Sequence, residues 1–142
     1  MIVTCFRNGN KLLICGNGGS AAMASHLACE FMGKFERERP PLPAISLVTD
    51  SSFITAWSND YVHGFDTIFV RQVTALGNRG DILIVFSTSG KSQNCLYAIE
   101  EAKKIGMGII DWPREGNGTA QIQEFQFKLM HNVCREVERE FL

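Results

Sequence analysis

The sequence predicts an α/β fold built on a parallel sheet, and three observations support this. Apolar runs of strand length alternate with longer segments of helical spacing along the 142 residues. The run 82–86 is apolar at every position, as in strands that helices cover on both faces. Two of the apolar runs break into small polar loops, 15–20 and 87–92, that lead into helical segments. Such alternation implies right-handed crossovers between parallel strands.

The first half of the chain begins with about one helical turn, followed by a strand at 11–15 and a helix at 20–33. The segment 34–43 holds three prolines and five charged residues, which predicts a surface loop. A strand at 44–48 comes next, and Thr49 or Asp50 is placed to cap the following helix, which ends near Asn59 and Asp60. A further helix at 65–76 stops near Gly77.

The second half predicts a strand at 82–86, a helix at 92–105 that ends at Gly106, and a strand at 107–110. A long helix at 119–141 closes the chain, with an apolar stripe that starts at Ile122 and ends at Phe141. The passage from Ile110 to Thr119 is too short for another crossover and edge strand. The layout therefore looks incomplete at this point, as it does at the short N-terminus.

Length and composition predict a single domain over residues 1–142. A net charge of −1 gives no reason to expect nucleic acid or an anionic membrane as a partner. No apolar stretch approaches the roughly 20 residues that span a bilayer, and no signal peptide is visible. The cysteines lack a CxxC pair, which favours reduced core thiols and a cytoplasmic protein; they are Cys5, Cys15, Cys29, Cys95 and Cys134.

The two polar loops predict a binding site for a phosphorylated, hydroxyl-rich ligand. Loops at the carboxyl ends of parallel strands meet in one crevice, and the amides that begin the next helix favour an anion. The pattern Gly16-x-Gly18-x-x-Ala21 formally matches a dinucleotide fingerprint. No acidic residue closes the second strand at the required distance, so a nicotinamide cofactor is not favoured.

Two helical segments carry the side chains that could do chemistry. His26 and Glu30 stand four residues apart, so both project from one helix face and could bind a divalent metal or share a proton transfer. On spacing alone, a solvated helix face or a satisfied core pair stays open. Gln123 and His131 lie on one row of the last helix, where an ordinary half-buried histidine is the alternative. His63 is interpreted as a surface residue.

Six motifs together resemble the sugar isomerase (SIS) domain family over nearly the whole chain. They are Gly16-Asn17-Gly18-Gly19-Ser20, His26-x-x-x-Glu30, Arg39-Pro40-Pro41-Leu42-Pro43-Ala44, Ser58-Asn59-Asp60, Ser87-Thr88-Ser89-Gly90 and Ile122-Gln123-Glu124. The resemblance implies a three-layer αβα sandwich with a flavodoxin-like parallel sheet. Against that pattern the chain lacks most of an N-terminal helical region and a helix-strand segment after about residue 110.

The resemblance also implies roles for individual residues. It places the sugar phosphate on Ser87, Thr88, Ser89 and Ser92, and the sugar on Asn17, Gly18, Gly19, Ser20, Glu30, Asn59, Asp60 and Gln123. It implies one zinc ion held by His26, Glu30, Gln123 and His131, and it assigns the proton transfers to Glu30 and His131. Two positions depart from the pattern: Lys91 replaces a small polar residue, and Gln126 stands where a histidine is common.

The implied activity is the conversion of sedoheptulose 7-phosphate to D-glycero-D-manno-heptose 7-phosphate through an enediol, for bacterial surface glycans such as lipopolysaccharide. The alternative is a non-catalytic SIS protein, either a sugar-phosphate sensor or a regulator of replication initiation. Gln123 and His131 lie about 12 Å apart along their helix, so one ion reaches both only through extended side chains, or different subunits share the site. Family members are tetramers, and we expect a homotetramer here.

Overall fold

The sheet of the computed structural model, which describes all residues 1–142, has four parallel strands in the order β2-β1-β3-β4. The strands are β1 (Leu12–Gly16), β2 (Ala44–Ser46), β3 (Ile82–Phe86) and β4 (Gly108–Asp111). In the register, Leu12 of β1 lies between Ala44 and Ile82, and Ile82 pairs with Gly108. This confirms the predicted parallel α/β architecture.

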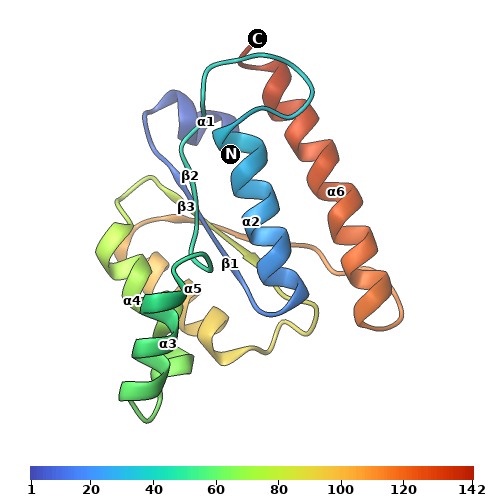
Figure 1. Cartoon of the computed structure of the whole chain (residues 1–142). Helices are drawn as coiled ribbons and strands as arrows, with labels where there is room; N and C mark the ends of the chain where they lie inside the picture. Colours follow the sequence, from blue (N-terminus) through green and yellow to red (C-terminus); the bar gives the residue numbers. More distant parts are fainter.

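Helices cover both faces of the sheet, which gives the predicted three layers (Figure 1). One face packs against α1 (Ile2–Arg7), α2 (Gly19–Met32) and α6 (Thr119–Arg139), and the other against α4 (Gly64–Leu76) and α5 (Gln93–Ile105). Successive residues of the central strands alternate between the two cores, as Leu12 and Leu13 of β1 do. Both cores need apolar side chains, which explains why β1 and β3 are apolar throughout.

The expected element boundaries are confirmed to within a few residues, and β2 is the main difference. It ends at Ser46 rather than Val48, because after Leu47 the chain turns toward α3 (Ser51–Asp60). The backbone N–H of Leu47 still donates to Ile14 O, at 2.8 Å. The Asp50 side chain accepts the N–H of Phe53 at 3.0 Å, so Asp50 is the cap and the alternative, Thr49, is not.

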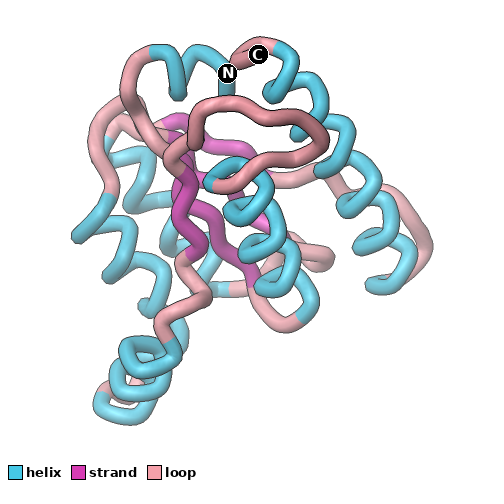
Figure 2. Tube along the Cα trace, turned by 45° about the horizontal axis from the view of Figure 1, so that its top comes forward, coloured by secondary structure: helices cyan, strands magenta, loops and turns pink.

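The loop between α2 and β2 arches over the end of the molecule where α6 finishes (Figure 2). Its backbone N–H groups at Phe35, Glu36 and Arg37 donate to the buried carboxylate of Glu138, at 3.0–3.1 Å. Arg39 of the same loop donates to the carbonyl of Phe31 at 2.9 Å. The loop is therefore bonded to both helices that flank it.

The chain passes directly from β4 into the approach to α6, which confirms that no further helix or strand lies between them. Trp112 fills this corner: it is 2% exposed, and its ring lies 4.9 Å from that of Phe86. Its indole N–H donates to the carbonyl of Gln126 at 3.3 Å. The short connection is thus packed against the end of β3.

Three further expectations can be checked on the fold. All five cysteines are free thiols, and only Cys29 is exposed, in agreement with reduced core thiols. None of the helices combines the length and the apolar character that crossing a membrane requires. His63 is exposed, with an Asp66 carboxylate 3.6 Å from its ring, so the surface interpretation of this residue is confirmed.

Candidate active site

The two polar loops meet at the carboxyl ends of β1 and β3, as the sequence predicts. β1 and β3 are hydrogen-bonded neighbours, and their last residues, Gly16 and Phe86, are paired in the register. A small cavity of about 130 Å³ opens between the loops. Its lining is polar apart from one ring, and consists of Asn17, Ser20, Phe86, Ser87, Thr88, Ser89 and Ser92. Six of these seven are residues that the resemblance assigns to the substrate.

Hydrogen bonds fix the shape of both loops. The Ser87 and Ser89 hydroxyls accept the backbone N–H of Gly90 and Lys91, at 2.9 and 3.1 Å. The amides of Asn17 and Asn94 bond reciprocally, at 2.8 and 2.9 Å, and join the first loop to the start of α5. Asn94 is 1% exposed and was not singled out in the sequence. Its only sequence signal is an amide in the first turn of a helix that follows a polar loop.

Gln123 reaches this loop region from the first turns of α6. A Cβ atom added to Gly19 would overlap the Gln123 side-chain amide. The absence of a side chain at Gly19 therefore lets α6 approach the start of α2. Gln123 forms no hydrogen bond with His26, Glu30 or His131 in the chain, so its assignment as a fourth zinc ligand stays a prediction.

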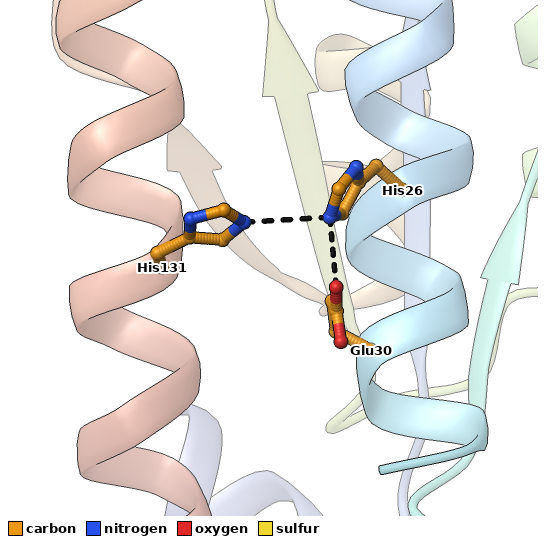
Figure 3. Close-up of side chains that lie close together, drawn as sticks. All are labelled: His26, Glu30 and His131. Carbon is orange, nitrogen blue, oxygen red and sulfur yellow. Dashed lines mark hydrogen bonds and ion pairs between the residues drawn. The ribbon is translucent and has the colours of Figure 1, made fainter. Parts of the chain in front are cut away.

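The remaining three predicted metal ligands converge between α2 and α6 (Figure 3). His26 Nε2 lies 2.7 Å from Glu30 Oε1 and 3.4 Å from His131 Nε2. All three ligand atoms lie within 4.8 Å of one another, and all three residues are partly buried. One chain supplies the whole cluster, so sharing of His26, Glu30 and His131 between subunits is not required.

Two aromatic rings lie against the histidines of this cluster. The Phe127 ring lies 4.4 Å from His131 and 5.1 Å from His26, in both cases edge to face. Phe35, from the loop after α2, lies 5.3 Å from the His131 ring. The loop that Glu138 anchors therefore forms one side of the cluster.

Asn59 and Asp60 are not brought to this site within the chain. They end α3, are exposed, and line neither of the cavities near the loops. The Asn59 side-chain amide donates to the Asp60 carboxylate at 3.1 Å. Their assignment to the sugar stays a prediction and needs an arrangement that a single chain does not provide.

Gln126 occupies a structural position that the sequence did not reveal. It is fully buried, and its Nε2 donates to the carbonyls of Pro113, Ser87 and Trp112, at 3.1–3.5 Å. Its Oε1 has no hydrogen-bond partner. Gln126 thus connects α6 to the loop after β3 and to the corner at Trp112.

Comparison with known proteins gives consistent results. The SIS domain model matches residues 1–111. The phosphoheptose isomerase of Campylobacter concisus is 44% identical over 157 residues, which cover 99% of this chain and 82% of the relative. That of Roseiflexus is 46% identical over 154 residues, which cover 97% and 77%. The first alignment is longer than the 142 residues of this chain, so the relative contains residues that this chain lacks.

Solved structures of the same kind of enzyme share the fold. A phosphoheptose isomerase from Francisella tularensis superimposes with a TM-score of 0.91 at 39% identity, over 97% of this chain and 81% of that one. A phosphoheptose isomerase from Neisseria gonorrhoeae gives 0.88 at 36% identity, with the same coverage. The chain therefore belongs to the SIS domain family, and within that family it groups with the phosphoheptose isomerases.

Proposed function

We propose that this chain is a ketose–aldose isomerase that converts sedoheptulose 7-phosphate to D-glycero-D-manno-heptose 7-phosphate. The relatives that are phosphoheptose isomerases support this activity. The product is the first intermediate on a route to nucleotide-activated heptose for bacterial surface glycans. We also propose that the chain works in the cytoplasm as a homotetramer.

The relatives carry the choice of substrate, and the spacing of the site along α2 is compatible with a sugar phosphate of this length. Ser20 lines the phosphate cavity, and His26 of the cluster follows six residues later, about 9 Å along the helix. C2 of a heptose 7-phosphate is seven bonds from phosphorus, which is also about 9 Å for an extended chain with C–C bonds near 1.5 Å. A triose phosphate, at three bonds, is too short to reach both places.

The cluster between α2 and α6 fits a zinc ion. Two imidazole nitrogens and one carboxylate oxygen form a donor set that zinc commonly takes in proteins, and the three atoms lie within 4.8 Å of one another. We propose that His26, Glu30 and His131 hold the ion. When bound, zinc would supply Lewis-acid stabilisation of negative charge on the substrate oxygens.

The chain's own residues would carry out the proton transfers. The reaction removes a proton from C1, delivers one to C2, and moves a proton between the two oxygens, with an enediol between ketose and aldose. Glu30 and His131 divide these transfers in our proposal. The Ser87–Ser92 loop holds the phosphate at the far end, so the carbonyl end of the sugar is directed toward the cluster.

A turnover assay tests this proposal. The chain is incubated with sedoheptulose 7-phosphate, and the aldose heptose phosphate is detected by chromatography and mass spectrometry. Glu30→Gln and His131→Ala should each abolish turnover while the melting temperature shows that they fold. Glu136→Gln and His63→Ala, two exposed positions away from the cluster, serve as matched controls and should keep wild-type activity. A sugar-phosphate sensor would bind the ketose and form no aldose.

A further inference from the structure

The cavity at the end of β3 contains no charged side chain. Its lining residues are neutral: hydroxyls, one amide and one aromatic ring. A sugar phosphate is largely dianionic at neutral pH, and its binding is strongest where hydrogen-bond donors and positive charge converge. Any positive side-chain charge near this neutral lining therefore belongs to residues just outside it.

Arg114 is the cation in contact with the loop that forms this cavity. Its Nε donates to the carbonyl of Ser87 at 2.8 Å, and a Cβ on Gly90 would lie 2.9 Å from its Cζ. The guanidinium thus lies directly on the Ser87–Gly90 turn, and it is 28% exposed. The residue at position 90 has a φ of +65°, which favours glycine, so both the turn and the guanidinium depend on the absence of a side chain there.

Asp111 holds the guanidinium directly, and Gln126 holds the backbone carbonyls next to it. Arg114 Nη2 forms an ion pair with Asp111 at the end of β4. The carbonyl of Pro113, the preceding residue, accepts the buried Gln126 amide at 3.1 Å, and Ser87 O accepts it as well. Arg114 Nη1 donates to no group of the chain. Lys91, the other cation of the loop, is exposed and forms no ion pair.

We propose that Arg114 is a positioning residue for the substrate's phosphoryl group. It fixes the Ser87–Gly90 turn by holding the Ser87 carbonyl, and it places a positive charge beside the neutral cavity. This inference rests on the proposed function for the identity of the ligand. It goes further by assigning part of the phosphate affinity to Arg114, which lies outside residues 1–111, the part of the chain that the SIS domain model matches.

Binding of inorganic phosphate, measured by calorimetry on the full chain, tests the inference without turnover. Arg114→Gln should weaken phosphate binding about tenfold or more, since a charge-assisted hydrogen bond and the adjacent charge are both lost. Arg114→Lys keeps the charge but not the planar donor set, so its phosphate affinity should lie between those of wild type and Arg114→Gln. Gly90→Ala should cause a similar loss, because its Cβ displaces the guanidinium. Lys103→Gln, which removes an exposed cation on α5 away from the cavity, is the control and should stay within twofold of wild type.

Steady-state kinetics separate positioning from a general structural defect. Arg114→Gln should raise the KM for sedoheptulose 7-phosphate about tenfold, with kcat within threefold of wild type. Phosphate affinity within twofold of wild type in Arg114→Gln, or an equal loss in Lys103→Gln, would overturn the inference. So would a wild-type chain that does not bind millimolar phosphate. Phosphate binding that depends on Arg114 without any turnover would refute the proposed function and leave this inference standing.

Discussion

The carboxylate of Glu138 offers a sharp test of how the loop over the cluster is held. It is 3% exposed and accepts three backbone N–H groups, from Phe35, Glu36 and Arg37. The Arg39 guanidinium lies 3.8 Å away, and its Nε has no hydrogen-bond partner in the chain. Glu138→Gln preserves the volume and removes the charge.

The cost follows from these contacts. The Gln amide group turns at least one N–H donor toward a loop N–H, and a buried unsatisfied donor costs about 1–3 kcal/mol. The remaining bonds lose their charge assistance, and Arg39 loses its buried counter-ion. Removing one partner of a buried ion pair typically costs about 3–5 kcal/mol, and we expect a loss in that range. For a domain of this size, the melting temperature should fall by about 10–15 °C.

The pH dependence of this difference has a definite sign. Burial alone would raise the pKa of Glu138, but hydrogen bonds from the loop N–H groups and the charge of Arg39 outweigh it, so the pKa lies below the ordinary value of 4.5. As the pH falls, the Glu138 carboxylate of the unfolded chain therefore takes up a proton before that of the folded chain does. The stability that Glu138 provides is therefore complete above that ordinary value and is lost as the pH falls further.

Urea unfolding of wild type and Glu138→Gln at several pH values measures both effects. Glu136→Gln, at an exposed ion pair two residues away, is the control and should change the free energy of unfolding by less than about 0.5 kcal/mol. A loss below about 1 kcal/mol in Glu138→Gln at pH 7 would show that the loop does not depend on this carboxylate. An undiminished difference in acid would refute the titration argument.

Three further predictions follow from the same structure. Asp81 is 1% exposed, accepts the N–H of Asn78 at 2.8 Å and pairs with Lys11. Burial alone would raise the pKa of Asp81, but the hydrogen bonds from Lys11, Asn78 and Asn10 outweigh it and hold that pKa below 3.8. Asp81→Asn should cost about 3 kcal/mol in urea unfolding at pH 7, and this cost should shrink only as the pH falls below the ordinary value of 3.8. An equal loss at pH 3 would contradict this. Gly19→Ala should lower kcat/KM at least tenfold, because its Cβ displaces Gln123, and should leave the melting temperature within about 3 °C. Dialysis against a chelator should lower the melting temperature, and one Zn²⁺ per chain should restore it in wild type but not in His131→Ala.

Most of the fold could be predicted because the sequence is locally consistent. The apolar run 82–86 and the polar loop after it located β3 and its site, and the pair Thr49 and Asp50 marked the start of α3. β2 was predicted two residues too long, because Leu47 and Val48 remain apolar where they pack against the core after the strand has ended. Composition cannot distinguish a buried turn from a strand at that point.

The site was predicted in part, for a physical reason. His26 and Glu30 share one helix, so their spacing alone placed them on one face. Their contact with His131 depends on how α6 packs on α2, which no local pattern encodes. Asn94 and Arg114 act through contacts with residues distant in the chain, which local patterns do not encode, and Gln126 was noticed only as a departure from the family pattern. Asn59 and Asp60 were assigned by resemblance, and a single chain leaves them outside the site.

Solvent deuterium labelling tests most directly whether the carboxylate and imidazole between α2 and α6 move a proton on the bound sugar. The chain is incubated with sedoheptulose 7-phosphate in D₂O, and the aldose product is examined by NMR. We expect deuterium at C2 of the heptose phosphate formed by wild type, and neither product nor label with Glu30→Gln. Labelled product from Glu30→Gln, or a wild-type product that carries no deuterium at C2, would contradict the mechanism.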